Sequence, residues 1–209
     1  MPEDDLIKLS EDDKPGSQWL GVIDFWFGAP GSPERGELRP VWWGKDENID
    51  SAAFDAEIRE RFQPLHESAL KGELDHWIET PAAALALVIC LDQFPRNIFR
   101  KSARAFGGDA KALEVAKAAI SKGYEADMCD TARQFFYMPF EHSEDLAEQR
   151  RSVELFTALR GPDDVEFAQH HYDIIARFGR FPHRNEALDR ESTAEEIAYS
   201  ENPENRFGQ

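Results

Sequence analysis

The run from Ala82 to Leu91 is apolar at nearly every position, and it constrains the fold more than any other segment. It is far too short to span a lipid bilayer. Thr80-Pro81 directly before it is a strong helix start, because a threonine can cap the first turn and proline is tolerated within it. A helix that is apolar on all sides must be surrounded by protein. The sequence therefore predicts a central, buried helix with other helices packed around it.

Amphipathic helical patterns fill most of the remaining chain, whereas the alternation typical of strands is almost absent. Pro95 is expected to end the central helix at Phe94, because the residue before a proline disfavours the α conformation. Pro64 is expected to kink or divide another helix. Including caps and stop residues, the other expected helices are 18–27, 50–72, 109–123, 131–137, 143–161, 165–178 and a last one from 193. The expected N-terminal caps are Asp50 or Ser51, Ser143, and a capping box of Thr193 and Glu196. The sequence therefore predicts an all-α protein.

A chain of 209 residues suits one domain with a substantial core. Residues 17–200 carry the helical patterns and are predicted to form that domain. Residues 1–16 are polar, contain two acidic runs and end in Pro15-Gly16, so we expect a flexible acidic leader. Residues 201–209 are expected to form a C-terminal tail.

The net charge of −17 argues against nucleic acid or an anionic membrane as the main partner, since both need a basic surface. The two cysteines, Cys90 and Cys129, lie beside apolar helical runs, which fits free thiols in a reducing compartment. The segment from Met1 to Leu20 lacks the continuous apolar core of a signal peptide. We therefore predict a cytoplasmic protein with no nucleic-acid or membrane partner.

Three short blocks place an aromatic residue, a proline and then polar side chains after a helical run. Two of them echo each other: 92–97 reads Asp-Gln-Phe-Pro-Arg-Asn, and 180–185 reads Arg-Phe-Pro-His-Arg-Asn. The third, 136–142, reads Phe-Tyr-Met-Pro-Phe-Glu-His. Arginines concentrate around the two echo blocks although the chain as a whole is acidic. These blocks are the candidates for a functional site.

The same blocks resemble signature segments of one bacterial family, the domain-of-unknown-function family number 924. The segments that carry the resemblance are 22–28, 91–97, 105–109, 136–144 and 177–185. Together they extend the likeness over nearly the whole chain. The resemblance implies a tetratricopeptide-like fold, a right-handed array of antiparallel helical hairpins. It implies no particular activity.

The arginines of the echo blocks allow two interpretations. Near a helix C-terminus, an arginine can bond the last carbonyl groups and compensate the helix dipole. Alternatively, the blocks converge and present guanidinium groups to a small anion, because arginine binds carboxylate and phosphate bidentately. Asp92 would then orient an arginine. The predicted ligand-binding residues are Asp92, Arg96, Asn97, Tyr137, Arg180, Arg184 and Asn185.

Acid–base groups accompany these arginines. Glu141 and His142 end the third block, His183 lies within the second echo block, and His170 lies on a predicted helix. Such groups can exchange protons with a bound ligand. Alternatively, Glu141 or His142 caps the following helix or pairs with an arginine. The predicted catalytic residues are Glu141, His142, His170 and His183.

Familiar motifs for metals, nucleophiles and cofactors do not occur in the sequence. His-Glu-x-x-His, Gly-x-Ser-x-Gly and a glycine-rich phosphate loop are all absent. Gly107-Gly108-Asp109 precedes a predicted helix and fits a turn and cap, although a helix N-terminus can also bind an anion. We therefore predict neither a metal nor a cofactor.

Three hypotheses follow for the blocks. In the first, they line a pocket for a small anionic metabolite, with or without an enzymatic reaction. In the second, the protein is a non-catalytic module that binds a peptide on the concave face of tetratricopeptide-like hairpins. In the third, the blocks serve packing only. A wide separation of Arg96 and Arg184, each bonded to helix-end carbonyls, would exclude the pocket.

Overall fold

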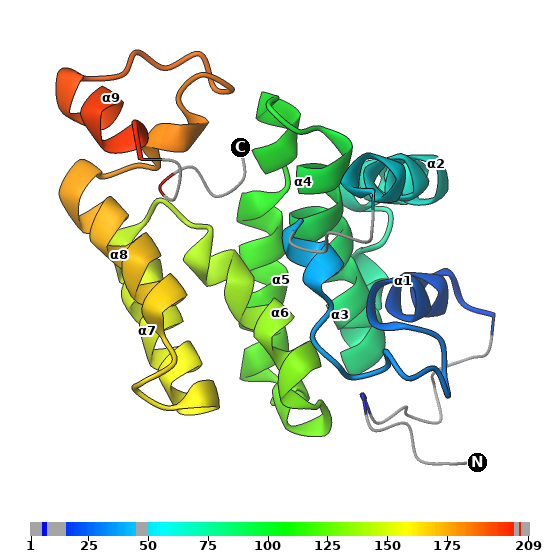
Figure 1. The fold of residues 1–209 in the computed structure, drawn as a ribbon. Coiled ribbons are helices and arrows are strands. Elements are labelled where there is room, and N and C mark those ends of the chain that lie inside the picture. The colour runs from blue at the N-terminus through cyan, green and yellow to red at the C-terminus, as the bar shows by residue number, and fades with distance from the viewer. Residues whose placement is uncertain (1–5, 8–15, 45–49, 203–204, 206–209) are drawn as a thin grey trace.

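The computed structural model of the chain describes residues 6–7, 16–44, 50–202 and 205. Within these residues the regular elements are helices, and no strand occurs. A single isolated antiparallel bridge joins Ile7 to Met128. The predicted all-α fold is therefore confirmed (Figure 1).

In the second half of the chain consecutive helices pack on each other, α6 against α5 and α7, and α7 against α8, whereas in the first half α1 packs on α3 and α2 on α4 (Figure 1). The α-helices are α1 (Gln18–Phe27), α2 (Ser51–Leu70), α3 (Pro81–Val88), α4 (Phe94–Ile98), α5 (Asp109–Ser121), α6 (Asp130–Glu141), α7 (Leu146–Arg160), α8 (Glu166–Phe178) and α9 (Ala194–Ser200). The short 3₁₀ helices are η1 (Pro40–Trp43), η2 (Asp75–Glu79), η4 (Ala103–Phe106), η5 (Tyr124–Asp127) and η6 (Pro182–Arg184), and η3 (Ile89–Gln93) is a π-helical segment.

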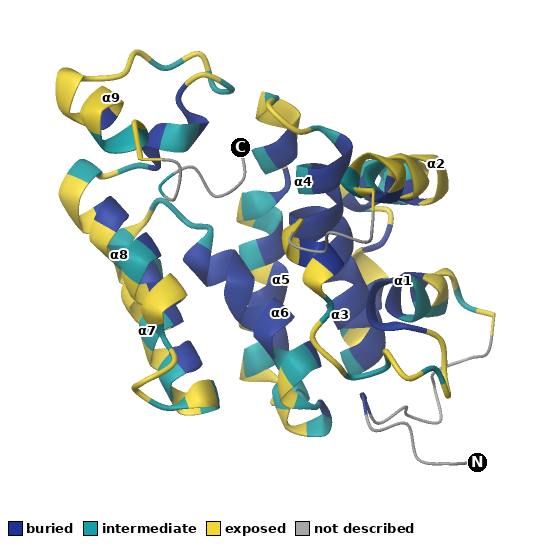
Figure 2. Cartoon of the chain, viewed as in Figure 1, coloured by how far each residue is buried: buried dark blue, intermediate teal, exposed yellow. Residues whose placement is uncertain are grey.

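The predicted central helix is confirmed. Every residue from Ala82 to Pro95 is buried, and α1, α5 and α6 pack around α3 (Figure 2). Burial on all sides explains why this segment has no polar face. The end of this helix positions the polar residues of the first echo block.

The chain does not leave the helix at Phe94, and this sequence prediction was wrong. In η3 the helix widens by one residue, so that the Phe94 N–H donates to the Ile89 carbonyl. Phe94 then begins α4 with φ −55° and ψ −43°, and Pro95 follows in the first turn. Proline fits there because its missing N–H would have no helical partner. After the π-helical segment η3, a new α-helical segment therefore begins at Phe94, with Pro95 in its first turn.

Gly108 lies directly against the backbone of this widened segment. A Cβ atom at residue 108 would be 2.2 Å from the Leu91 carbonyl oxygen and 3.1 Å from its carbonyl carbon. In a regular α-helix the N–H of residue 95 would bond the Leu91 carbonyl, but Pro95 has no N–H. The Leu91 carbonyl therefore leaves room for a close neighbour. The absence of a side chain at Gly108 therefore lets α5 begin next to the first echo block.

Two other helices also run through prolines. The third block was expected to break its helix, but α6 continues through Pro139 to Glu141. Likewise, α2 is continuous through Pro64. A proline within a helix removes one hydrogen bond, and the long buried faces of both helices outweigh that loss. Glu141 is therefore the last residue of a helix rather than part of a loop.

Two of the expected helix caps are confirmed and one is corrected, while Thr80 is the N-cap residue of α3 but makes no capping hydrogen bond with its side chain. Asp50 caps α2, and Thr193 with Glu196 forms the predicted capping box of α9. The cap of α7 is Asp145, not Ser143: its Oδ1 accepts hydrogen bonds from the backbone N–H groups of residues 147 and 148 at 2.7 and 3.2 Å. Aspartate two residues later is an equally strong N-cap.

A second, smaller core holds the C-terminal part of the chain. Ile174, Ile175 and Phe181 form it, separate from the main core. The Glu144 carboxylate ties this part to the rest, because it accepts hydrogen bonds from Arg190 at 2.8 and 2.9 Å and from the Phe181 N–H at 2.8 Å. The candidate site lies where these two parts meet.

At Leu6 and Ile7 the structure differs from the expected loose leader. Both side chains are fully buried, and the Cys129 N–H donates to the Leu6 carbonyl at 3.0 Å. Two apolar side chains in an otherwise polar segment fill a gap in the core. The other leader residues, 1–5 and 8–15, and the tail residues 203–204 and 206–209 lie outside the described residues.

Across the described part of the chain, no helix is both long enough and apolar enough to cross a membrane. The finer prediction of a tetratricopeptide-like, right-handed array stays a prediction.

Replacing Gly108 by alanine should lower the free energy of unfolding by about 1–3 kcal/mol, as overpacking does. The reason is the contact of 2.2 Å between the new Cβ atom and the Leu91 carbonyl oxygen. Urea denaturation of wild type and variant measures the change.

The matched control is Gly107→Ala. Its Cβ atom would meet nothing closer than the Arg104 carbonyl oxygen at 3.6 Å, and Gly107 has an ordinary helical φ of −63°. If both variants were equally stable, the close approach at Gly108 would not matter.

Candidate functional site

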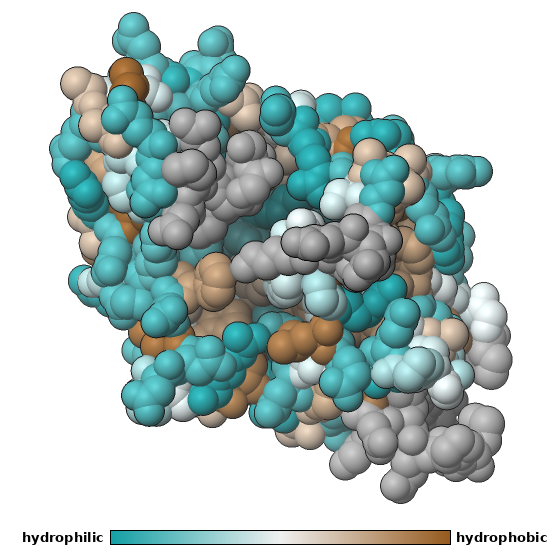
Figure 3. All heavy atoms as spheres, in the orientation of Figure 1, coloured by the Kyte–Doolittle hydropathy of each residue, from teal (hydrophilic) through white to brown (hydrophobic). Residues whose placement is uncertain are grey.

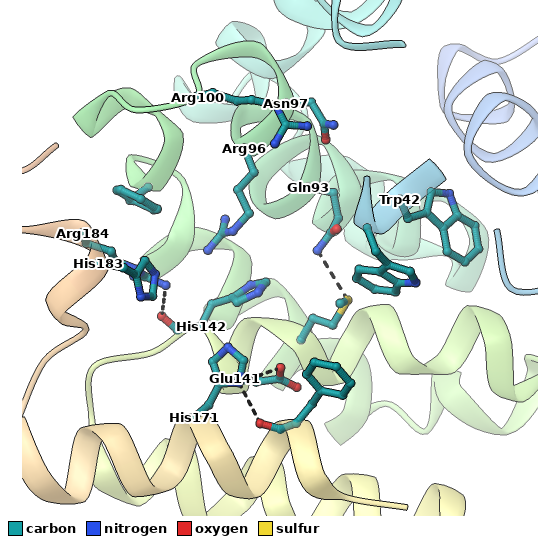
Figure 4. A pocket seen from close by; sticks show the side chains of 14 residues that line it. Trp42, Gln93, Arg96, Asn97, Arg100, Glu141, His142, His171, His183 and Arg184 are labelled. Carbon is teal, nitrogen blue, oxygen red and sulfur yellow. Dashed lines mark hydrogen bonds and ion pairs between the residues drawn. The ribbon is translucent and has the colours of Figure 1, made fainter. Parts of the chain in front are cut away.

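A cavity of about 200 Å³ lies between the main body and the C-terminal part. Figure 3 shows a hollow near the middle of this face, and Figure 4 shows the cavity from close by. The residues predicted from the sequence that line it are Arg96, Asn97, Glu141, His142, His183 and Arg184. The other lining residues are Trp42, Trp43, Gln93, Arg100, Phe106, Met138, Phe167 and His171.

Asp109, the first residue of α5, joins the two echo blocks. Its Oδ1 accepts a hydrogen bond from Arg96 Nη1 at 2.8 Å. Its Oδ2 accepts from Arg96 Nη2 at 3.0 Å and from Arg184 Nη1 at 3.1 Å. Arg96 and Arg184 therefore bind the same carboxylate, and the two blocks meet at one wall of the cavity.

The same arginines also bond backbone carbonyls near helix ends. Arg96 Nη1 donates to the Asp92 carbonyl at 2.5 Å, and Arg184 Nη2 donates to the His142 carbonyl at 3.0 Å. The Phe106 ring lies beneath both guanidinium groups, with its centroid 5.8 Å from the Arg96 guanidinium carbon and 4.6 Å from that of Arg184. Each arginine is thus held by a carboxylate, a carbonyl and an aromatic face.

The charges of this wall compensate each other. Arg96 and Arg184 face Asp109, and Arg96 Nη1 also lies 3.3 Å from Asp92 Oδ1. Burial lowers the pKa of Arg184 to about 10, although Asp109 opposes this change, so the side chain stays charged at neutral pH. Its Nε is buried with no hydrogen-bond partner among the described residues. The wall therefore offers guanidinium donors without a large net charge.

Asp92 and His142 form a buried carboxylate–imidazole pair. His142 Nδ1 lies 2.7 Å from Asp92 Oδ1, and Gln93 Nε2 donates to Asp92 Oδ2 at 2.5 Å. Burial alone would raise the pKa of Asp92, but Arg96 and His142 hold it well below its ordinary value. Asp92 is therefore ionised and accepts the proton of His142 Nδ1.

This pairing fixes the tautomer of His142. Burial, assisted by the charge of Arg96, lowers the pKa of His142 even though Asp92 opposes the change. The ring is then neutral at pH 7, and with Nδ1 protonated its lone pair is on Nε2. His142 is thus poised to accept a proton at Nε2.

Glu141, the neighbour of His142 in the chain, is a buried carboxyl group. Burial raises the pKa of Glu141 to about 7, with the charge of Asp92 adding to the effect and His142 opposing it. At neutral pH this group is therefore divided between its acid and its ionised form. A carboxyl group in this range can give or take a proton.

His171 of α8 contacts that carboxyl group. Its Nδ1 bonds the Phe167 carbonyl at 2.8 Å and lies 3.1 Å from Glu141 Oε1 (Figure 4). Burial lowers the pKa of His171 to about 3, outweighing the hydrogen bond to Phe167. The contact with Glu141 therefore joins a carboxyl group to a neutral imidazole. Burial similarly lowers the pKa of His183 to about 2, so this ring is neutral too.

Several residues predicted for the site lie elsewhere. Tyr137 packs in the core against Phe156, with ring centroids 5.8 Å apart. Arg180 binds the Glu196 carboxylate at 2.6 and 2.8 Å, and Asn185 Nδ2 donates to Ser192 Oγ at 3.0 Å. These two side chains of the second echo block secure the C-terminal segment. Asp92 lies behind the cavity wall, where it holds His142.

His171, and not the predicted His170, faces the cavity. Successive residues of an α-helix point about 100° apart, so only one of the two neighbours can do so. His170 lies against Tyr199, with its Nε2 3.0 Å from the hydroxyl oxygen. The buried face of α8 contains Ala168, His171 and Ile175. Their helical spacing was the sequence signal that favoured His171.

Near the cavity, the Asp55 carboxylate binds one side chain of α4 and another just beyond the end of that helix. Asn97 Nδ2 donates to Asp55 Oδ1 at 2.8 Å, and Arg100 bonds both carboxylate oxygens. Among the residues that the structure describes, no group of three or more histidine, cysteine, aspartate or glutamate side chains is arranged to hold a metal ion.

The sequence matches the model of a bacterial family described as "Bacterial protein of unknown function (DUF924)" over residues 22–204. The chain belongs to this family. The resemblance drawn from the three blocks is thereby confirmed. All three blocks, and with them every cavity-lining residue, fall within the matched range.

A solved structure is similar over most of this DUF924 chain. It is titled "Structure of Protein of Unknown Function ATU0120 from Agrobacterium tumefaciens" and is 41% identical, with a TM-score of 0.75. The similarity covers 88% of this chain and 96% of that one. No curated protein matches the sequence.

Replacing Asp109 by asparagine should lower the free energy of unfolding by about 3 kcal/mol, because it leaves two partly buried guanidinium groups without their shared carboxylate. Denaturation with urea measures the loss. The control is Asp130→Asn, since Asp130 is also the first residue of its helix but is 70% exposed and pairs only with Arg133, at 3.3 Å. A surface pair of this kind contributes less than about 1 kcal/mol. Equal losses in the two variants would show that the helix N-terminus, not the arginine bridge, needs the charge.

Proposed function

We propose that this cavity binds a small ligand through an anionic group and transfers a proton on it, so that the protein is an enzyme. The observation that carries the proposal is the meeting of Arg96 and Arg184 on Asp109 beside Glu141 and His142. Two guanidinium groups and two proton-transfer groups then line one cavity (Figure 4).

The arginines supply the recognition of the anion. Arg96 donates three hydrogen bonds to Asp92 and Asp109, and a guanidinium group carries more N–H groups than that. Arg184 still has the unpaired Nε. Planar guanidinium forks match carboxylate and phosphate groups. Because Phe106 stacks beneath both groups, their orientation is set before the ligand arrives.

His142 and Glu141 supply the proton transfer. Asp92 keeps the proton of His142 on Nδ1, so Nε2 acts as the general base. Glu141, with a pKa of about 7, acts as the acid. Two titratable groups whose surroundings shift their pKa values differently are typical of an acid–base pair.

The compensated charges of the wall couple anion binding to protonation. Asp92 and Asp109 already balance Arg96 and Arg184, so an ionised Glu141 would repel the incoming anion. The ligand therefore binds best while Glu141 holds its proton.

The small volume of the cavity supports this proposal over a peptide-binding module. A cavity of about 200 Å³ is smaller than the roughly 300–1,000 Å³ of sites for drug-sized ligands, and a peptide needs more room. Arg96, His142 and Glu141 lie around this one small space (Figure 4). The cytoplasmic location also remains part of the proposal, supported by the free thiols of Cys90 and Cys129.

Replacing Arg184 by lysine should weaken binding of inorganic phosphate or a small carboxylate at least about tenfold, because lysine keeps the charge but loses the fork. Isothermal titration calorimetry at pH 6 measures the dissociation constants. Arg151→Lys is the control, because Arg151 is half-exposed and pairs with Glu154 on the surface of α7. If wild type binds neither kind of anion, or if both variants bind equally well, the proposal fails.

Sulfate affinity should fall about tenfold between pH 6 and pH 8.5. Sulfate itself does not titrate there, whereas Glu141, with a raised pKa of about 7, is protonated below this pH and ionised above it. Above pH 7, Glu141 must therefore take up a proton when the anion binds. Titrations at several pH values should show this slope in wild type and not in Glu141→Gln, whose side chain stays neutral. The same slope in both proteins would contradict the role of Glu141.

A further inference from the structure

Two exposed aromatic side chains flank the polar cavity. Among the described residues, the large apolar side chains that are exposed are Leu38, Trp43, Leu70, Phe167 and Ile197. The aromatic members of this set, Trp43 and Phe167, both line the cavity. Single exposed apolar residues are ordinary on a protein surface. The coincidence of both aromatic ones at one polar cavity requires a physical reason.

Contacts with Trp42, which itself packs on Trp26, fix the position of the Trp43 ring. It packs edge-on against Trp42, with ring centroids 6.2 Å apart, and Trp42 stacks on Trp26 at 5.7 Å. The Trp42 indole N–H donates to the Trp26 carbonyl at 3.0 Å. Arg39, just before η1, bonds the carbonyls of residues 25 and 26 at 2.8 Å each. The indole of Trp43, 41% exposed, is therefore presented at the mouth by a fixed support.

Phe167 stands on another element, in the first turn of α8, and is 63% exposed. Its own carbonyl accepts the hydrogen bond of His171 Nδ1 at 2.8 Å, so its backbone is tied to the proton-transfer groups. Met138 and Phe106 continue an apolar lining further into the cavity. Apolar surface is thus present along the cavity on both sides of the polar groups.

We infer that the ligand is amphiphilic: a carboxylate or phosphate group enters the cavity, and an aromatic ring or short apolar chain attached to it lies between Trp43 and Phe167. This inference rests on the proposed function and names the substrate class of that site. The cavity is small and the arginines that bind the head group line it, so the apolar part of the ligand stays at the mouth. There it covers aromatic surface that would otherwise contact water, which favours binding.

The test compares matched anions with and without a ring. Acetate is paired with phenylacetate, and phosphate with phenyl phosphate, and dissociation constants are measured by NMR titration at pH 6. In wild type, the phenyl compound of one pair should bind at least about tenfold more tightly than its small counterpart. The pair with the tighter binding identifies the head group as carboxylate or phosphate.

Substitutions at the mouth then test the position of the ring. Trp43→Ala and Phe167→Ala should each reduce the preference for the phenyl compound several-fold and change the affinity for the small anion less than about twofold. Trp43→Phe should retain most of the preference. Leu38→Ala is the matched control, because Leu38 is 56% exposed on the same segment but does not line the cavity.

The possible failures are distinguishable. If small anions bind but the phenyl compounds bind no better, or if the mouth variants keep the full preference, the inference is overturned and the proposed function stands. If neither small nor phenyl anions bind to wild type, both are overturned.

Discussion

The Asp109 carboxylate is the contact on which the candidate site depends. It binds the arginines of both echo blocks, one at the end of the central helix and one in the C-terminal part. Asp109 can occupy this position only because Gly108 lets α5 begin against the Leu91 carbonyl, which Pro95 leaves open. The π-helical segment η3, Pro95, Gly108 and Asp109 together therefore place this carboxylate between the two arginines.

Burial sets the chemistry of the cavity more than charge does. It lowers the pKa values of His142, His171 and His183 and raises that of Glu141 to about 7, so at pH 7 the three histidines are neutral and Glu141 is only partly ionised. For Asp92 and Arg96, charged neighbours outweigh burial: Arg96 and His142 lower the pKa of Asp92, and Asp109 and Asp92 raise the pKa of Arg96. Neutral imidazoles and a partly protonated carboxyl group therefore lie beside arginines whose charges Asp92 and Asp109 compensate.

Most of the fold follows from the sequence, since helix periodicity and capping are local properties. The apolar run at 82–91 required a buried central helix, and Thr193 with Glu196 required a capping box. The errors concern proline. Local preference predicts a break at Phe94 and Pro139, but the packing of neighbouring helices keeps both segments helical and absorbs the lost hydrogen bonds.

The sequence by itself determined the all-α class, the family and the three blocks in which polar residues gather. Only the tertiary structure decided which members of those blocks face one space. The reason is that side-chain direction depends on helix phase and on contacts between distant segments: His171 faces the cavity where His170 does not, and Arg180 turns to Glu196 while Arg184 turns to Asp109. The bridge at Asp109 joins residues far apart in the chain, so no local pattern could reveal it.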